Sequence, residues 1–392
     1  MPLPSHIKKY LVLSYVSQAF TFAVPLLSAL LASKDDLSSS QVAFLLMVIY
    51  AIVGVLQFFV GKFFDQGKYL FSLYASFVGV LLGLSIFIVA FDQLLWFIFG
   101  TTILLLGIGI LATAITRAIE GSVPLTFRGR VATVKYLVQN IGFCTAAIIG
   151  FFFLQEHRTL LLSLDLLTTL SVIVFLLVLF KTMLRVENLP STRRTLAFSE
   201  IWSLFRARWR VFLGAQLIFI EIFSHSEVQP ILYDRLGLET IRWTTFMFVC
   251  NTATVVLVTS LITKYGKGKN IKAISFIGAL FYGIGHGMVP YFLQPWGIAM
   301  TTVISVLGEI FWVAPLATVV YMQFKDDDVG MASGIRMTIR SFAFVFNPII
   351  AFILFRYIPD VRLGFALIYG LIPLLGFWLI FSSPYVENIE LQ

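Results

Sequence analysis

The chain has 392 residues, of which 59% are hydrophobic, 16% aromatic and only 12% charged. A soluble globular domain carries about 25% charged residues, so this composition excludes an ordinary soluble enzyme and indicates a protein surrounded largely by lipid. The formal net charge of +8 is compatible with binding to nucleic acid or to a membrane surface, and the positions of the basic residues decide between them.

Twelve apolar runs follow one another along the chain, each bounded by charged residues, Gly or Pro. A membrane-spanning helix needs roughly 20 apolar residues, and continuous runs favour helices over the alternating strands of a barrel. Twelve such helices leave short loops and no room for a soluble catalytic domain of about 100 to 150 residues. The first run is too long for the core of a signal peptide, so we expect a retained helix. The runs lie at 10–32, 41–60, 70–91, 94–116, 130–153, 160–182, 211–232, 242–263, 272–292, 297–321, 331–354 and 363–382.

The distribution of basic residues predicts the orientation in the membrane. Cytoplasmic loops carry an excess of Lys and Arg. With the N-terminus inside the cell, most of the 28 Lys and Arg lie on or near the cytoplasmic side, and the outside loops carry only Lys34, Arg158, Arg235, Arg242, Arg356 and Arg362. Both termini are therefore predicted to be cytoplasmic, and topology accounts for the net charge without nucleic acid.

A basic connection from Met183 to Trp209 divides the runs into six and six. We expect an N-terminal six-helix bundle over 1–182, a cytoplasmic basic linker over 183–210 and a C-terminal six-helix bundle over 211–392. Apolar residues at 198, 201, 202, 204 and 205 have rough helical spacing. This segment is either an amphipathic helix on the anionic inner leaflet or part of a solvated linker.

The two halves resemble each other in sequence. Gly129 and Gly330 are separated by the same interval as Lys135 and Arg336, and a Gly-Lys dipeptide after the second run recurs after the eighth. Several matches at nearly one interval indicate a duplicated six-helix unit, which is the arrangement of many secondary transporters.

The turn at 61–68, Gly-Lys-Phe-Phe-Asp-Gln-Gly-Lys, resembles the signature of the major facilitator superfamily between its second and third helices. Gln66 stands where a basic residue is usual. Pro124 to Arg130 is similar to the family's connection between helices 4 and 5. The resemblance covers essentially the whole chain and implies an all-α membrane protein of twelve transmembrane helices in two pseudo-symmetric bundles. It also implies gating roles at the cytoplasmic face for Asp65, Arg128 and Arg130.

Two shorter stretches resemble the bacterial drug/proton antiporter branch of that family. They are Tyr136 to Asn140, and Leu307 to Ile310 followed by Pro315. Helix 5 differs from the antiporter pattern, because the region from 142 to 150 has no Gly-Pro pair and Lys135 stands where an acidic residue is usual. These differences leave the substrate and the direction of transport open.

Ionisable residues inside the apolar runs are the first candidates for function, because a charge deep in a bilayer is costly unless it faces a cavity or a partner. Glu221 and His225 lie one turn apart, and Glu309 lies in the middle of the tenth run. The resemblance places the seventh and tenth helices along a central cavity. There a carboxyl group can bind and release a proton, so we predict these three residues as proton-coupling groups; the alternative is structural hydrogen bonding.

Other ionisable residues receive different assignments. Glu227 is predicted to be an outer gate or, slightly preferred, a solvated rim residue. Asp165 and His286 fall on the sixth and ninth helices, which the resemblance makes scaffold, so the predicted site omits them.

Basic and polar residues on the predicted cavity helices are candidates for binding substrate. Lys135, Arg336 and Arg340 could bind an anionic group, neutralise the cavity carboxylates or extend to the lipid headgroups. Neutral polar residues could orient a ligand or join helices by hydrogen bonds: Tyr15, Gln18, Tyr50, Gln139, Asn140, Asn251 and Asn347.

Enzymatic activity has no support in the motifs, because nucleotide-binding and hydrolase signatures do not occur. We predict a secondary active transporter that works by alternating access, with proton-coupled export of a small amphipathic compound or drug preferred. The alternatives are proton-coupled uptake of a small anionic or zwitterionic metabolite, and a non-transporting membrane protein on the same fold. We expect a monomer in the lipid bilayer of a bacterial inner membrane, with a small-molecule substrate and protons as partners, and with no cofactor, metal or nucleic acid.

Overall fold

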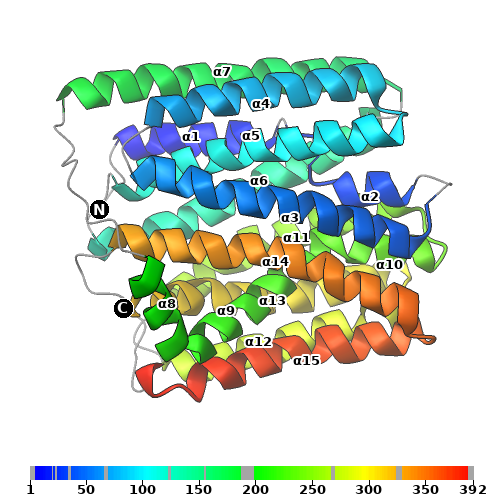
Figure 1. Ribbon diagram of the computed structural model, residues 1–392. Helices are drawn as coiled ribbons and strands as arrows, with labels where there is room; N and C mark the ends of the chain where they lie inside the picture. The colour runs from blue at the N-terminus through cyan, green and yellow to red at the C-terminus, as the bar shows by residue number, and fades with distance from the viewer. Residues whose placement is uncertain are drawn as a thin grey trace. The chain divides into compact units, whose positions relative to one another are not determined.

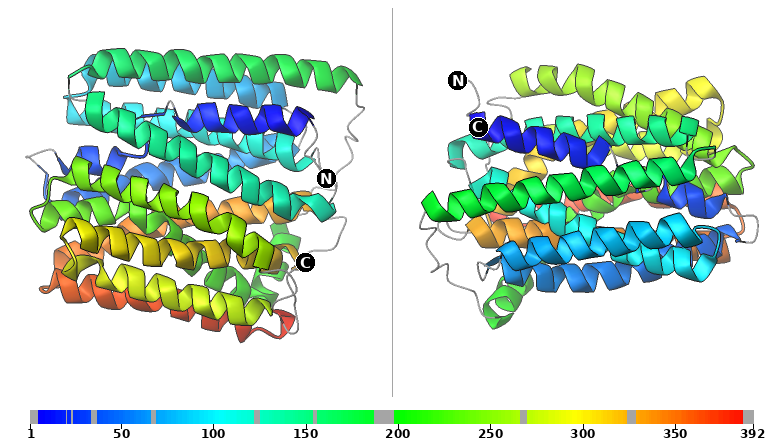
Figure 2. Two further views of the ribbon diagram at one scale, coloured as in Figure 1. Left: turned by 180° about the vertical axis from the view of Figure 1, so that it is seen from behind. Right: turned by 90° about the horizontal axis from the view of Figure 1, so that it is seen from above.

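A computed structural model of the protein describes residues 5–19, 21–22, 24–33, 37–65, 69–121, 125–153, 156–186, 198–265, 270–323 and 329–386. Its elements in these ranges are α-helices and short 3-10 helices. The chain divides into two compact units, of which unit 1 is Met1–Leu27 with Val48–Thr195 and unit 2 is Ser28–Met47 with Leu196–Gln392. Figures 1 and 2 show that the long helices within each unit lie lengthwise beside one another.

The helices of unit 1 are long and joined by short connections. They are α1 (Ser5–Ala19), most of α3 (Ser39–Asp65), α4 (Tyr69–Ala90), α5 (Leu94–Gly121), α6 (Leu125–Phe153) and α7 (Arg158–Val186).

Unit 2 contains the remaining elements and the first part of α3. They are α2 (Leu27–Ala32), α8 (Phe198–Ala207), α9 (Trp209–Glu227), α10 (Gln229–Arg235), α11 (Thr240–Tyr265), α12 (Ile271–Met288), η1 (Val289–Tyr291), α13 (Pro295–Tyr321), α14 (Val329–Tyr357), α15 (Val361–Phe381) and η3 (Pro384–Val386).

The same packing scheme occurs in both units. In unit 1, α4 packs on α5 and α7, while α1 packs on α6; in unit 2, α12 packs on α13 and α15, while α9 packs on α14 (Figure 1). Glycines allow the closest contacts, as small residues do in membrane proteins. A Cβ added to Gly107 would lie 2.8 Å from the backbone nitrogen of Val80, and one on Gly308 would lie 2.6 Å from that of Tyr282.

Within the described residues, nine helices are long and apolar enough to cross a membrane, or ten if the bent pair α9 and α10 is one span. Large apolar side chains on these helices are exposed, among them Val89 at 85% and Leu95 at 82%. Such a surface suits lipid rather than water. The prediction of an all-helical membrane protein is confirmed.

Two of the predicted runs are broken rather than continuous. The first, 10–32, consists of α1 and α2, between which residues 21–22 and 24–26 are non-helical, and Pro25 there lacks a backbone N–H. The seventh, 211–232, bends by 48° between α9 and α10. There Pro230 cannot donate a hydrogen bond to the carbonyl of Ser226, so the regular helix stops at Glu227.

The segment with helical spacing in the predicted linker does form a helix, α8. The ring of Phe205 stacks on Phe212 of α9 with centroids 4.5 Å apart, while Trp202 is 62% exposed. One side of α8 therefore packs on α9, and the exposed ring of Trp202 lies elsewhere on the helix.

Candidate functional site

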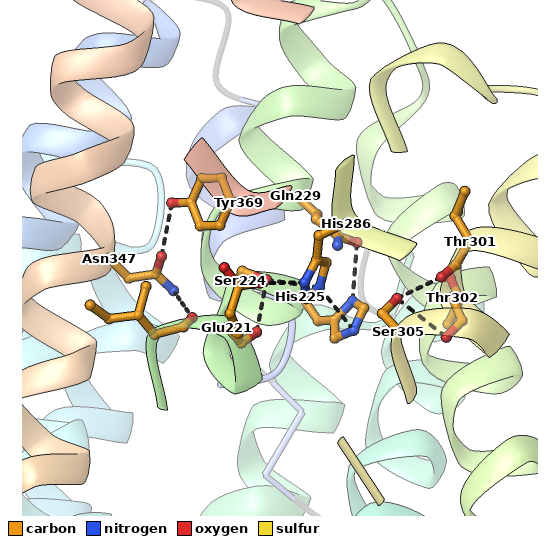
Figure 3. Close-up of polar contacts among 11 residues, drawn as sticks. Glu221, Ser224, His225, Gln229, His286, Thr301, Thr302, Ser305, Asn347 and Tyr369 are labelled. Carbon is orange, nitrogen blue, oxygen red and sulfur yellow. Dashed lines mark hydrogen bonds and ion pairs between the residues drawn. The ribbon is translucent and has the colours of Figure 1, made fainter. Parts of the chain in front are cut away.

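A chain of buried polar side chains runs through unit 2 from the middle of α9 to the start of α10. Glu221 and His286 are both 0% exposed, and Oε2 of Glu221 contacts Nδ1 of His286. Nε2 of His286 lies 3.3 Å from Nε2 of His225. Nδ1 of His225 lies 3.2 Å from Oε1 of Gln229. Figure 3 shows the two imidazole rings between Glu221 and Gln229, and we call these four residues the buried chain.

Ser224 connects to the same group of residues. Its hydroxyl donates a hydrogen bond to the backbone carbonyl of Glu221 at 2.9 Å, and its Oγ lies 3.1 Å from Nε2 of His286. Ser224 is fully buried, at 0% exposed. It therefore contacts the central imidazole of the buried chain from the side.

Local sequence explains how α9 presents these groups. Positions three and four apart in a helix lie on one face, so Glu221, Ser224 and His225 form a continuous polar surface. The bend at Val228 keeps Gln229 close to His225 although α9 has ended. The hydrogen bond between their side chains thus joins the two helices across the break.

Close helix packing places His286 against α9. A Cβ added to Gly285 would lie 2.5 Å from the backbone nitrogen of Ser305 in α13, and one on Gly283 would lie 2.5 Å from the carbonyl oxygen of Gly370 in α15. The ring of Tyr282 stacks on His286 with centroids 5.5 Å apart. His286 is therefore held between α13, α15 and its own helix, facing Glu221.

A second polar group lies on the other side of α9. The hydroxyl of Tyr369 donates to Oδ1 of Asn347 at 2.9 Å, and Nδ2 of Asn347 donates to the carbonyl of Ile220 at 3.1 Å. In Figure 3, Asn347 and Tyr369 lie on one side of the buried chain and Thr301, Thr302 and Ser305 on the other.

Glu227 is buried, at 1% exposed. The interpretation of this residue as a solvated rim residue is therefore wrong. The reason is tertiary, because α9 bends into α10 directly after Glu227 and α14 packs on α9.

The buried chain has the chemistry of a proton-binding site. A carboxyl group and an imidazole in contact hold one proton between them without net charge, either as the neutral pair or as the ion pair. Burial of an unpaired charge is far more costly than burial of such a pair. Within the described residues, no three or more His, Cys, Asp and Glu side chains are arranged to hold a metal ion.

The structure places the other predicted ionisable residues as follows. Glu309 is buried in α13, at 5% exposed. Lys135 in α6 and Arg340 in α14 are half-buried, and the guanidinium of Arg340 lies 5.1 Å from the centre of the Phe223 ring. Four more lie in α3, α6 and α14 with side chains outside the described part of the structure: Asp65, Arg128, Arg130 and Arg336.

Three of the predicted neutral polar residues make hydrogen bonds within their own unit, namely Tyr15, Asn140 and Asn347. The hydroxyl of Tyr15 lies 3.5 Å from Oγ1 of Thr145, and Nδ2 of Asn140 donates to the carbonyl of Tyr136 at 2.9 Å. Gln139 is half-buried. The remaining members other than Asn347 are buried: Gln18, Tyr50 and Asn251.

Sequence reasoning omitted His286, which the structure brings into contact with both Glu221 and His225. The omission followed from treating the ninth helix as scaffold. The available signal was the residue itself, since a histidine within an apolar run requires a polar partner. Tyr369 was likewise missed, because a tyrosine in such a run is an ordinary packing residue.

Comparison with known proteins assigns the family. The sequence profile of the Major Facilitator Superfamily matches residues 10–348. The chain belongs to the major facilitator superfamily. No curated protein sequence matches the chain, so the superfamily is the level at which sequence comparison places it.

Solved structures of transporters share the fold. The human organic anion transporter MFSD10 (TETRAN) has a TM-score of 0.68 and 13% identity, over 96% of this chain and 100% of that one. A POT family transporter in complex with 5-aminolevulinic acid has a TM-score of 0.69 and 13% identity, over 98% of this chain and 97% of that one. A D-xylose-proton symporter has a TM-score of 0.64 and 16% identity, over 98% of both chains. Superfamily and fold together indicate a transporter rather than an enzyme.

Proposed function

We propose that this protein is a secondary active transporter that couples the movement of a small solute to that of protons by alternating access. The observation that supports proton coupling is the contact between Glu221 and His286, extended to His225, inside a unit that contains helices long and apolar enough to cross a membrane. A membrane protein with no use for protons gains nothing from burying three titratable side chains together, because their desolvation is costly.

Within this proposal, Glu221 and His225 bind the coupling proton, and Glu309 is a second acidic residue that exchanges protons or contacts substrate. The side chains of Glu221 and Glu309 are buried in unit 2, at 0% and 5% exposed respectively. The proposed topology has twelve spans with both termini in the cytoplasm, two six-helix bundles over 1–182 and 211–392, and a basic linker over 183–210. Asp65, Arg128, Arg130 and Glu227 would take part in gating.

The preferred direction is export of a small amphipathic compound by a monomer in a bacterial inner membrane. Its support is the resemblance of the stretches 136–140 and 307–310 to drug/proton antiporters, together with the aromatic content of 16%. Aromatic side chains suit pockets for amphipathic ligands, since they provide large apolar contacts at low entropic cost.

A second candidate is proton-coupled uptake of a small anionic or zwitterionic metabolite. It is favoured by the half-buried basic side chains of Lys135 and Arg340, with Arg336 in the same helix as the latter. Solved relatives that carry the names of an organic anion transporter and of a complex with 5-aminolevulinic acid agree with this candidate.

Proton flux in proteoliposomes tests the proposal. The protein is reconstituted with a trapped pH-sensitive dye and exposed to lipophilic cations, sugars, amino acids and organic acids in turn. We expect one class to elicit proton movement, and its chemistry and direction distinguish export from uptake. Glu221→Gln should abolish this movement, and Glu309→Gln should reduce it strongly.

Glu239→Gln is the matched control, because Glu239 is an exposed acid that pairs with Arg242 at 3.7 Å outside the buried chain. This variant should transport as the wild type does. Undiminished solute-driven proton flux in Glu221→Gln would overturn the coupling role. Silence of folded protein across the whole panel would favour the non-transporting alternative.

A further inference from the structure

We infer that His286 relays the coupling proton between Glu221 and His225, and that Ser224 sets the tautomer from which the relay starts. The inference rests on the proposed function, because it specifies the route of the proton that the transporter couples to its solute. It assigns a task to a histidine of α12, a helix that packs on α13 and α15 within unit 2.

The hydroxyl of Ser224 decides which nitrogen of His286 carries hydrogen. A serine hydroxyl has one hydrogen to donate, and here it is donated to the carbonyl of Glu221 at 2.9 Å. At 3.1 Å from Nε2 of His286, Ser224 Oγ can then only accept. Nε2 of His286 must therefore carry the hydrogen in this arrangement.

The rest of the buried chain follows from that assignment. Nε2–H of His286 also faces Nε2 of His225 at 3.3 Å, so this second nitrogen is bare. A neutral His225 then carries its hydrogen on Nδ1 and donates to Oε1 of Gln229 at 3.2 Å. At the other end, Nδ1 of a neutral His286 is bare and lies against Oε2 of Glu221, so we assign the hydrogen of this contact to the carboxyl group of Glu221. Each of the three contacts in the buried chain then holds one hydrogen, and in each the donor is on the side of Glu221 and the acceptor on the side of Gln229.

Two proton transfers carry one proton from Glu221 to His225. In the first, the carboxyl hydrogen of Glu221 passes to Nδ1 of His286. In the second, the hydrogen on Nε2 of His286 passes to Nε2 of His225. Glu221 becomes a carboxylate, His286 is again neutral with its hydrogen on Nδ1, and His225 becomes an imidazolium. One proton has moved the length of the chain, and no other reactant is needed.

The destination of the proton lies beside the break between α9 and α10. A charged imidazolium donates a stronger hydrogen bond than a neutral imidazole. Arrival of the proton at His225 therefore strengthens its bond to Gln229, which bridges the 48° bend. If His225 then releases the hydrogen on its Nδ1, the hydrogen bond to Gln229 loses its donor. Proton movement is thus linked to the geometry of a broken span.

Other titratable groups near the chain come from the elements packed against α9 and α12. Tyr369 of α15 lies near Glu221 and Glu227, and Tyr282 stacks on His286. Arg340 of α14 contacts the Phe223 ring on α9, and Glu309 is buried in α13. In the contacts of the buried chain itself, an acid faces an imidazole only between Glu221 and His286.

Nitrogen-15 NMR of histidine-labelled protein in lipid bilayers tests the relay. The chain has four histidines, and the signals of His225 and His286 are assigned from His225→Gln and His286→Gln. With Glu221 protonated and both imidazoles neutral, His286 should carry its hydrogen on Nε2. When the pH is raised until Glu221 loses its proton, the hydrogen should switch to Nδ1, where it is donated to the carboxylate.

Three variants sharpen this experiment. Glu221→Gln should keep His286 in the Nε2–H form over the whole pH range in which the protein stays folded, because the amide can still donate to Nδ1. Ser224→Ala should give a mixture of tautomers. Ser226→Ala is the matched control, since Ser226 donates to the carbonyl of Phe223 at 3.2 Å on the same helix and should leave the His286 signals unchanged.

A His286 tautomer that does not respond to pH in the wild type would overturn the relay, as would identical signals from the two serine variants. These results are separate from the liposome assay. Solute-driven proton flux with an unchanging His286 tautomer would remove the relay and keep proton-coupled transport. The tautomer switch without any solute-driven flux would support the relay and remove the proposed transport function.

Discussion

Asp165 of α7 accepts a hydrogen bond from the backbone N–H of Phe22, with Oδ2 and the nitrogen 3.2 Å apart. Phe22 lies in the break between α1 and α2, where the backbone has no helical partner to offer. Oδ1 of the same carboxyl accepts from the hydroxyl of Thr169 at 3.0 Å. Because lipid offers no hydrogen bonds to a broken helix, a buried side chain must satisfy this group.

Replacement of Asp165 should therefore destabilise unit 1. Asp165→Ala leaves the Phe22 N–H without its acceptor and is expected to lower the free energy of unfolding by about 1 to 3 kcal/mol. Asp165→Asn keeps an oxygen that can accept from Phe22 and should cost much less. Thermal unfolding of the purified protein in one detergent measures both. An alanine variant as stable as the wild type would contradict this role.

The glycine contacts predict a sharp contrast between positions. A Cβ at Gly107 would lie 2.8 Å from a backbone nitrogen of α4, and a Cβ at Gly308 would lie 2.6 Å from one of α12. Alanine at either position should separate the two helices and cost about 1 to 3 kcal/mol. Gly370→Ala is the control, because its nearest neighbour lies at 3.4 Å. Thermal unfolding of the three variants should place Gly370→Ala near the wild type and the other two well below it.

Two buried tyrosines should respond differently to loss of their hydroxyl groups. Tyr369→Phe removes the donor to Oδ1 of Asn347 and is expected to cost about 1 kcal/mol. The hydroxyl of Tyr233 is buried without a hydrogen-bond partner among the described residues, so Tyr233→Phe should be neutral or stabilising. Equal losses of stability in both variants would argue against a specific bond from Tyr369 to Asn347.

The ion pair between Arg158 and Asp92 lies at the surface and should contribute little to the stability of the protein. Its two nitrogen–oxygen distances are 2.8 and 3.0 Å, but the Asp92 side chain is 77% exposed. Asp92→Asn should change stability by less than about 1 kcal/mol, and less at high salt. Arg158→Ala should cost more than Asp92→Asn, since the guanidinium also lies 4.5 Å from the centre of the Phe91 ring. Unfolding measured at low and high salt separates the two contributions.

Much of the fold follows from the sequence alone. The run predicted at 70–91 is α4, Tyr69–Ala90, and the run at 94–116 begins where α5 does, at Leu94. The physical reason is that a long apolar segment in lipid must satisfy its backbone internally, which a helix does within one segment. Family motifs at 61–68 and 124–130 then identified the superfamily, because they are local in sequence.

The breaks in the spans illustrate where local reasoning ends. Pro25 and Pro230 were visible in the sequence, yet prolines at 315, 348 and 373 lie inside continuous helices. Whether a proline interrupts a span depends on partners for the freed backbone groups. Asp165 provides one at Phe22, and it comes from a distant helix.

The candidate site divides in the same way. Glu221 and His225 could be recognised from their spacing on one helix, since helical geometry is encoded locally. The contacts of His286 and the burial of Glu227 were decided only by tertiary structure. His286 meets Glu221 because Gly283 and Gly285 let α12 approach α15 and α13 at backbone distance. Such contacts depend on shape complementarity between helices far apart in the chain, which no periodic pattern in one segment records.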